Sequence, residues 1–147
     1  MISRRATHVA SVLAVALLLA GCAGAGAGEA DGPATGGGPD VRTVVLDMRW
    51  SRFSQTELKV RAGETIRFVV RNHDPIPHEL IVGDQAVHDY HEQGTELHHR
   101  GRPGEVSVAA GATAETRYTF IQPGTLLFGC HLPGHWAYGM QGVIRVV

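Results

Sequence analysis

The sequence predicts an all-β domain, a Greek-key β-sandwich, over residues 41–147. Residues 65–72 and 115–121 alternate apolar with polar side chains, which is the period of a strand that buries one face. Glycine-containing pairs that favour turns precede several apolar runs: Ala62-Gly63, Ala110-Gly111 and Pro123-Gly124. Because no long helical pattern interrupts these runs, packing one sheet on another is the natural way to bury their apolar faces.

Eight short runs rich in β-branched and aromatic residues supply the strands. We expect them at residues 41–50, 57–61, 65–72, 79–82, 105–109, 115–121, 125–130 and 142–147. A long polar loop, 84–104, separates the fourth run from the fifth, and a short helix fits only within 84–96. A domain of this length holds a real core without disulfide bonds.

The first 21 residues resemble the signal peptide of a bacterial lipoprotein. Arg4 and Arg5 precede an apolar run, 9–20, that is too short to span a bilayer comfortably and leads into a small-residue motif ending in Cys22. The resemblance implies cleavage before Cys22 and lipidation of that cysteine, which would anchor an extracytoplasmic protein to a membrane. Residues 22–40 are rich in glycine and alanine, and we expect a flexible tether. The export route, general secretory or twin-arginine, stays open.

The charge of the chain argues against a polyanionic partner. The chain has 13 Lys and Arg against 14 Asp and Glu, a formal net charge of −1, and loss of Arg4 and Arg5 with the signal makes it more acidic. We therefore expect no nucleic acid among its ligands. We expect the domain to be a monomer.

The C-terminal part of the chain carries an unusual set of metal donors. Cys130, His135 and Met140 follow one another at five-residue steps. A thiolate, an imidazole and a weak thioether together favour copper over calcium, magnesium and, less completely, zinc, and they are donors of a type 1 copper site. His78, at the start of an expected strand, is the candidate for a second imidazole. With Cys22 lipidated, Cys130 is the one thiol left, and metal ligation explains a free cysteine in an exported protein.

These residues resemble the ligands of the cupredoxins, the blue copper family of plastocyanin, azurin and auracyanin. The family pattern, an upstream histidine followed by Cys, His and Met in the last loop, maps onto His78, Cys130, His135 and Met140. The resemblance covers residues 41–147. It implies a mixed β-sandwich, copper held shallowly at one end, electrons leaving through the exposed edge of His135, and redox proteins as partners. Candidates for an apolar docking patch around that edge are Ile76, Pro77, Leu132, Pro133 and Trp136, with ordinary packing an equal alternative for Trp136.

The sequence departs from the family pattern directly after the first histidine. The residue after the first histidine is commonly a small polar group that ties the two ligand loops together, whereas here it is Glu79. Asn72 is a candidate for bracing the loops instead, and capping a turn is its alternative role.

His131 follows Cys130, as in multicopper oxidases, where histidines on both sides of that cysteine reach a trinuclear copper cluster. Here Gly129 stands on the other side and the sequence has no His-x-His pair, so an oxidase is excluded by the ligand count. We expect His131 to lie at the surface, pointing away from Cys130.

Two other classes of site compete for the same residues. A cysteine nucleophile activated by His135 would make the chain an enzyme, but it leaves the other donors unexplained, and cysteine hydrolases bring their histidine from elsewhere in the fold. Structural zinc on His78, Cys130 and His135 is a closer rival, although methionine as a fourth donor argues against it. We expect no enzyme activity.

The histidines of the polar loop leave two functions open. His88, His91, His98 and His99 lie in it, and a second metal bound there would make copper tolerance or delivery the function. His88 and His91 share a face if the segment is helical. The alternative is a solvated loop whose histidines bind nothing, and both interpretations stay open. An electron carrier with one type 1 copper is our first hypothesis, and an exported copper-handling protein is the second.

Overall fold

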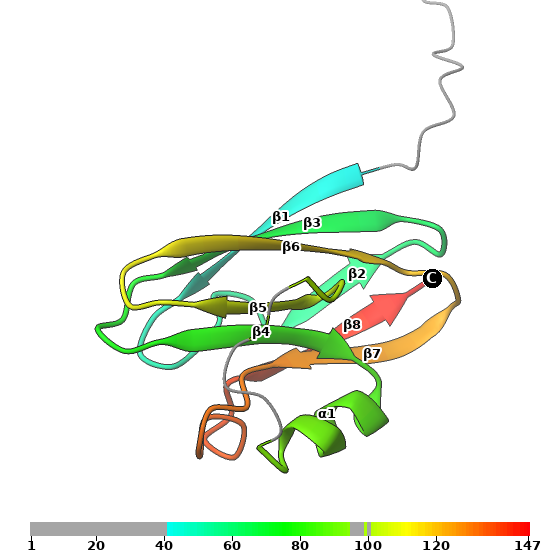
Figure 1. Ribbon diagram of the computed structural model, residues 1–147. Coiled ribbons are helices and arrows are strands. Elements are labelled where there is room, and N and C mark those ends of the chain that lie inside the picture. Colours follow the sequence, from blue (N-terminus) through cyan, green and yellow to red (C-terminus); the bar gives the residue numbers. More distant parts are fainter. Residues whose placement is uncertain (1–40, 95–98, 100) are drawn as a thin grey trace, which may run out of the picture. The chain divides into compact units, whose positions relative to one another are not determined.

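Two β-sheets packed face to face form the domain, in a computed structural model that describes residues 41–94, 99 and 101–147 (Figure 1). The described strands form a three-stranded sheet with the order β1-β3-β6 and a five-stranded sheet with the order β2-β8-β7-β4-β5. The first sheet consists of β1 Val41–Met48, β3 Thr65–Asn72 and β6 Thr113–Thr119. The second consists of β2 Glu57–Val60, β4 His78–Gly83, β5 Glu105–Val108, β7 Gly124–Gly129 and β8 Gln141–Val146. The predicted all-β sandwich is confirmed, and the expected signal and tether lie outside the described residues.

Both sheets mix parallel and antiparallel pairs. β1 runs parallel to β3, and β2 runs parallel to β8. The chain passes from β1 to β3 through β2, which belongs to the second sheet. The other paired strands are antiparallel. In the centre of the second sheet, Gly129 at the end of β7 pairs with Gln141 at the start of β8. The loop between β7 and β8 therefore begins and ends at the same end of the second sheet.

The core between the sheets follows the predicted alternation. Ile66, Phe68 and Val70 of β3 are fully buried, and each side chain of this size stabilises the fold by about 1.5–3 kcal/mol. The same apolar cluster includes Cys130 and Met140. Because Cys130 and Met140 stand at the two ends of the loop between β7 and β8, both ends of this loop are packed in the core.

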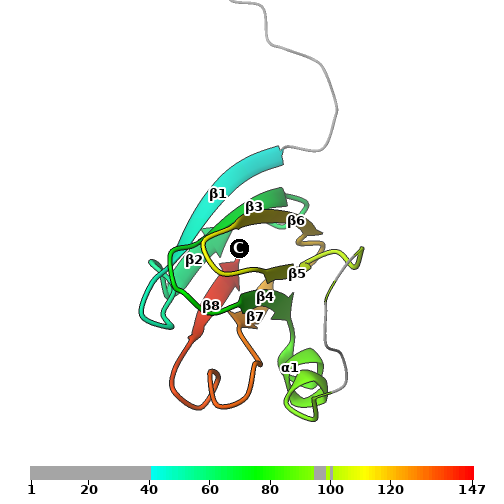
Figure 2. The same ribbon diagram turned by 60° about the vertical axis from the view of Figure 1, so that its left-hand side comes forward.

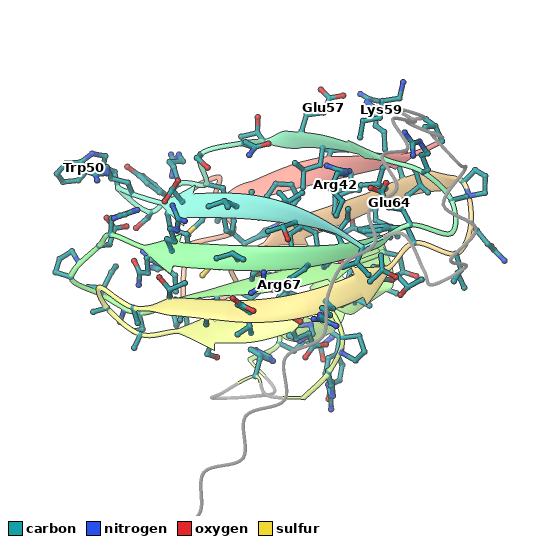
Figure 3. The ribbon with its side chains drawn as sticks, turned by 90° about the horizontal axis from the view of Figure 1, so that it is seen from above. Arg42, Trp50, Glu57, Lys59, Glu64 and Arg67 are labelled. Carbon is teal, nitrogen blue, oxygen red and sulfur yellow. The ribbon has the colours of Figure 1, made fainter. Side chains whose placement is uncertain are left out.

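An arginine joins the two sheets at one edge (Figure 3). Arg42 Nε on β1 donates to Glu64 Oε1 at 2.6 Å, and Arg42 Nη2 donates to the carbonyl of Lys59 on β2 at 3.0 Å. The hydrogen bond from Arg42 outweighs the effect of burial and lowers the pKa of Glu64. Figure 3 shows this clamp at the opposite end of the domain from Trp50.

A short helix, α1 Gln85–His91, follows β4 and lies beside the loop between β7 and β8 in both views (Figures 1 and 2). Asp84 caps its N-terminus, since Asp84 Oδ1 accepts a hydrogen bond from Val87 N at 3.0 Å. His88 and His91 are its buried residues. The helix expected within 84–96 is confirmed. In the described part of the chain, helices are too short or too polar to cross a membrane.

Candidate metal centre

Three of the four predicted copper ligands converge at one end of the second sheet. His78 begins β4, Cys130 follows β7, and His135 stands in the loop between β7 and β8. The Nδ1 atoms of His78 and His135 lie 3.2 Å apart, and Cys130 Sγ lies 3.3 Å from His135 Nδ1. All three donor atoms lie within 4.8 Å of one another. Donors that surround one ion at about 2.0–2.3 Å are separated by distances of this size, so the three side chains fit a bound metal.

Met140, the fourth predicted ligand, lies directly before β8 and is fully buried. Its backbone closes the loop, because Met140 O accepts from Cys130 N at 3.1 Å and Met140 N donates to His135 O at 3.0 Å. Gly134 and Gly139 have φ of +81° and +93°, in the left-handed region that favours glycine in tight turns. The main chain therefore ties the three candidate ligand residues of this loop, Cys130, His135 and Met140, to one another.

Asp74 fixes the orientation of His78. Its Oδ2 lies 2.8 Å from His78 Nε2, which leaves Nδ1 of that ring turned towards His135. The same carboxylate accepts hydrogen bonds from Trp50 N at 2.7 Å and Ser51 N at 2.8 Å. Burial alone would raise the pKa of Asp74, but these two N–H groups and the imidazole outweigh burial and lower it. Asp74 is thus an ionised acceptor that holds the ligand ring, as carboxylates behind metal-bound histidines do.

Asn72 braces the loop that leads to His78. Its Nδ2 lies within hydrogen-bond distance of three carbonyl oxygens, those of Ile76 at 2.8 Å, Ala109 at 3.0 Å and Val108 at 3.2 Å. Its Oδ1 accepts a hydrogen bond from Asp74 N at 2.9 Å. Asn72 thus joins the loop before His78 to the end of β5 and turns the chain into Asp74, whereas its described hydrogen bonds do not reach the loop between β7 and β8.

Glu79 connects the two ligand segments. Glu79 Oε1 accepts a hydrogen bond from His131 N at 2.7 Å, and His131 directly follows Cys130. Glu79 Oε2 lies 3.2 Å from His99 Nε2. The larger side chain at this position therefore ties the loops together, as a small polar group does in the family pattern, and in addition it reaches a second group of histidines.

Burial favours the neutral forms of Cys130 and His135. Burial raises the pKa of Cys130 to about 12, so the sulfur carries its proton. Burial, with a smaller contribution from the nearby charge of His78, lowers the pKa of His135. A metal cation entering this site has to displace the thiol proton, and binding is coupled to proton release.

His131 does not lie at the surface, and the prediction that it would is wrong. Its side chain is 2% exposed, with Nε2 at 2.8 Å from His88 Nδ1 and Nδ1 at 2.7 Å from Glu92 Oε1. The ring of Trp136 stacks on both imidazoles, at centroid distances of 4.6 Å to His131 and 4.7 Å to His88. Burial under this stack lowers the pKa of His88 to about 4 and also lowers the pKa of His131. α1 covers the residue after Cys130, which the sequence pattern did not reveal.

The histidines of the polar loop separate into two groups. His88 pairs with His131, whereas His91 and His99 lie close to Glu105, and these three residues place one donor atom each within 4.8 Å of one another. The solvated alternative fails for His88, His91 and His99, which are all buried. His98 lies outside the described residues.

The sequence reasoning missed Asp74 and Glu105. Asp74 stands four residues before His78, and a carboxylate close to a predicted ligand histidine is a signal for an orienting group. Glu105 opens the strand after the polar loop, and it meets the histidines only because β5 pairs with β4. Trp136 stacks on two imidazoles, so packing accounts for its ring.

The described residues thus form a β-sandwich with a group of nitrogen and sulfur donors gathered at one end. A family model described as copper binding proteins of the plastocyanin/azurin family matches residues 41–147. The chain therefore belongs to this copper-binding family, the cupredoxins, and the resemblance seen in the sequence is confirmed.

Two relatives with similar sequences are named copper-resistant cuproproteins. The chain is 39% identical to the copper-resistant cuproprotein CopI of Rubrivivax gelatinosus over 72% of this chain and 65% of that protein. It is 30% identical to the protein of the same name from Pseudomonas aeruginosa over 72% of this chain and 75% of the relative. The match thus takes in less than two thirds of the first relative.

Solved structures with this fold include two auracyanins. Dithionite-reduced auracyanin from Roseiflexus castenholzii has a TM-score of 0.62 and 21% identity, over 71% of this chain and 96% of the other. Auracyanin A from Chloroflexus aurantiacus has a TM-score of 0.58 and 21% identity, over 73% and 99%. These structures establish the shared fold.

Proposed function

We propose that the chain carries single electrons on one type 1 copper held by His78, Cys130, His135 and Met140, and that it makes or breaks no covalent bond of a substrate. The convergence of two imidazole Nδ1 atoms and a thiol sulfur at 3.2 and 3.3 Å carries the proposal, with the buried Met140 beside them in the sequence. Copper supplies a one-electron couple when bound. The soft sulfur donors favour that metal over calcium and magnesium and, less completely, over zinc.

The chain's own residues supply rigidity and a dry environment. Asp74 holds His78, the main chain ties Cys130 to Met140, and both sulfur residues are fully buried. Ligands fixed in this way need little rearrangement when the charge of the site changes by one. His135 is half-buried and offers the path for electrons to a redox partner. Around it, Ile76, Pro77 and Pro133 are exposed and Leu132 is half-buried, as a docking patch requires.

A second candidate function is copper handling, in which metal capture is the role and redox change is incidental. Two observations favour it: the relatives are named copper-resistant cuproproteins, and the loop histidines are gathered beside Glu105. Cyclic voltammetry and metal titration separate the two functions. A reversible one-electron wave with fast exchange to a redox protein supports the carrier. A metal stoichiometry above one that falls when loop histidines are replaced supports handling.

Met140→Leu is expected to keep the thiolate band of the copper protein and to raise its reduction potential. Loss of a weak donor to copper(II) should shift the potential by on the order of 60 mV or more, which corresponds to about tenfold weaker relative binding of the oxidised metal. Protein-film voltammetry measures the shift. Met48→Leu is the matched control, because Met48 is equally buried but ends β1. Equal potentials for the wild type and Met140→Leu would rule out Met140 as the axial ligand.

We propose that the domain works outside the cytoplasm on a lipid anchor at Cys22. The signal-like residues 1–21 and the small-residue motif before Cys22 support the proposal. Cys22→Ala is expected to move the protein from the membrane fraction to the soluble fraction of expressing cells, as measured by fractionation and immunoblotting. Cys130→Ala, which alters the other cysteine of the chain, should leave the anchoring unchanged. Persistent membrane binding of Cys22→Ala would refute the anchor.

A further inference from the structure

A second group of metal donors lies where α1 faces β5. His91 belongs to α1, Glu105 begins β5, and His99 stands between these elements in the sequence. Their side chains are 4%, 10% and 2% exposed, respectively. Glu105 Oε2 lies 3.2 Å from His99 Nδ1 and 3.8 Å from His91 Nε2. Donor atoms around one ion at about 2.0–2.2 Å have similar separations, so small side-chain movements would close this group on a metal.

The tautomer of His91 leaves a lone pair aimed into this group. His91 Nδ1 lies 2.7 Å from Val87 O, and because a carbonyl only accepts, the ring proton belongs on Nδ1. His91 Nε2 is buried and lacks a hydrogen-bond partner among the described residues. It faces the carboxylate of Glu105, which is also an acceptor. Two acceptors face each other at this distance favourably only when a cation or a proton lies between them.

His99 repeats this arrangement through Glu79. Glu79 Oε2 lies 3.2 Å from His99 Nε2 and Glu105 Oε2 lies 3.2 Å from His99 Nδ1; with the ring proton on Nε2, His99 donates to Glu79 and its Nδ1 lone pair faces Glu105. A carboxylate behind an imidazole is the usual support of a metal-bound histidine, because it fixes the ring and makes the other nitrogen a better donor. Two carboxylates, Glu79 and Glu105, therefore face the imidazole of His99, against one nearby guanidinium, that of Arg102.

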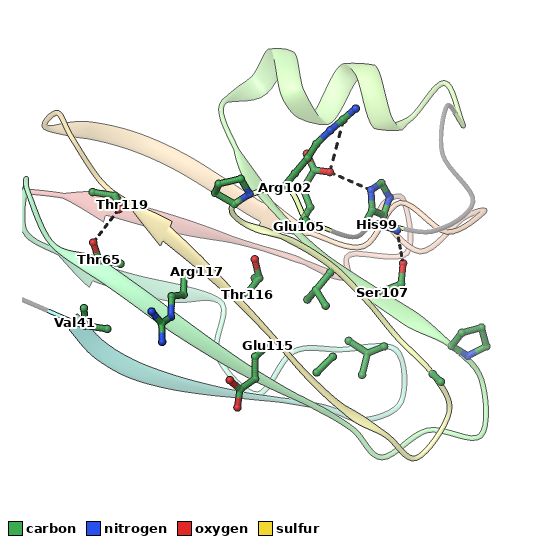
Figure 4. A pocket seen from close by; sticks show the side chains of 17 residues that line it. Val41, Thr65, His99, Arg102, Glu105, Ser107, Glu115, Thr116, Arg117 and Thr119 are labelled. Carbon is green, nitrogen blue, oxygen red and sulfur yellow. Dashed lines mark hydrogen bonds and ion pairs between the residues drawn. The ribbon is translucent and has the colours of Figure 1, made fainter. Parts of the chain in front are cut away.

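An open groove gives access to these donors. His99 and Glu105 line its end, between β5 and β6, and the groove has a volume of about 960 Å³ (Figure 4). Arg102 also lines the groove, 55% exposed, with Nη1 3.8 Å from Glu105 Oε2. The groove therefore borders two of the three donors, His99 and Glu105, and none of the first-site residues lines it.

We propose that His91, His99 and Glu105 form a second metal site for one divalent ion of borderline hardness, copper(II) or zinc(II). Two nitrogens and a carboxylate oxygen suit these ions, and the set contains no sulfur that would favour copper(I). The site deepens the copper-handling candidate, which invokes the same histidines, and it stands without the electron-carrier function. His88, although it is in the same loop, pairs with His131 and is not a ligand.

Metal titration of the full chain tests the second site. Copper(II) or zinc(II) is titrated into protein whose first site already holds copper, and binding is followed by isothermal titration calorimetry. One further equivalent of metal is expected to bind. Copper(II) there should give the paramagnetic-resonance signal of a nitrogen and oxygen site and add no thiolate absorption. Glu105→Gln and His91→Gln should each weaken this second binding by more than about 100-fold, which exceeds the roughly 10–100-fold cost of losing a group that only supports a ligand. Comparing the two ions tells which one the site prefers.

Matched variants keep the result interpretable. His88→Gln alters a buried histidine of the same helix, and His73→Gln alters an exposed one that pairs with Asp47, and both should retain the second equivalent. Thermal unfolding of the metal-free variants checks folding, and in protein whose first site already holds copper, a zinc-induced rise in Tm should appear in the wild type but not in Glu105→Gln. Absence of a second equivalent in the wild type, or its loss in His88→Gln alone, overturns the assignment. The visible band reports on Cys130 separately, so failure of one site is distinguished from failure of the other.

Discussion

Cys130→Ser is expected to abolish the visible absorption of the copper protein completely while the sandwich stays folded. The band arises from charge transfer from thiolate to copper(II), and Cys130 is the free cysteine in the described part of the chain. The hydroxyl of serine is nearly isosteric with the thiol but does not ionise. Its burial in the apolar cluster should cost about 1–3 kcal/mol of unfolding free energy. Absorption spectra and urea denaturation measure the two effects.

The other cysteine supplies the control for this variant. Cys22→Ser changes only the N-terminal thiol and should leave the band at full intensity. In the metal-free wild type, the pKa of Cys130 of about 12 predicts slow alkylation at pH 7, since the thiolate is the reactive form. A visible band that survives in Cys130→Ser would remove the thiolate from the site and with it the type 1 assignment.

Asp74→Ala should produce the second large effect, on metal affinity and stability together. The change removes the acceptor of His78 and of the backbone N–H groups of Trp50 and Ser51. Copper affinity is expected to fall about 10–100-fold, because the ligand ring loses its fixed orientation. The free energy of unfolding of the metal-free protein should fall by about 2–4 kcal/mol, the cost of leaving buried donors unpaired. Competition with a chelator and chemical denaturation measure these quantities.

A second carboxylate and histidine pair serves as the control for Asp74. Asp47 Oδ1 lies 2.7 Å from His73 Nε2, but both side chains are about 40% exposed. Exposed pairs contribute roughly 0–1 kcal/mol, so Asp47→Ala should change stability little and copper affinity not at all. Equal losses in Asp74→Ala and Asp47→Ala would mean that Asp74 has no special role in holding His78.

Local patterns in the sequence were sufficient for the fold. The alternation along residues 65–72 and the turn-forming glycines describe each strand within a few residues, because a strand's buried face is a local property. The loop motif of Cys130, His135 and Met140 is equally local, and two of its members are confirmed to lie together with His78. Placement of His78 relied on the family resemblance and on the start of a strand.

The rest of the site depends on contacts between segments far apart in the chain. His131 was expected at the surface because its sequence neighbours say nothing about α1, which packs over it through His88. Glu105 joins His91 and His99 only through strand pairing in the second sheet. Asp74 meets Trp50 and Ser51 across 24 and 23 positions of sequence. Such convergence carries no periodic signal.

The two oxygens of Glu79 have a thermodynamic consequence. Oε1 accepts a hydrogen bond from His131 N, next to Cys130, and Oε2 lies 3.2 Å from His99 Nε2. One carboxylate therefore contacts both candidate metal sites. Drawing electron density towards one oxygen weakens the acceptor at the other. Linkage is reciprocal: whatever factor an event at His99 imposes on equilibria at Cys130, an event at Cys130 returns to His99 unchanged in size.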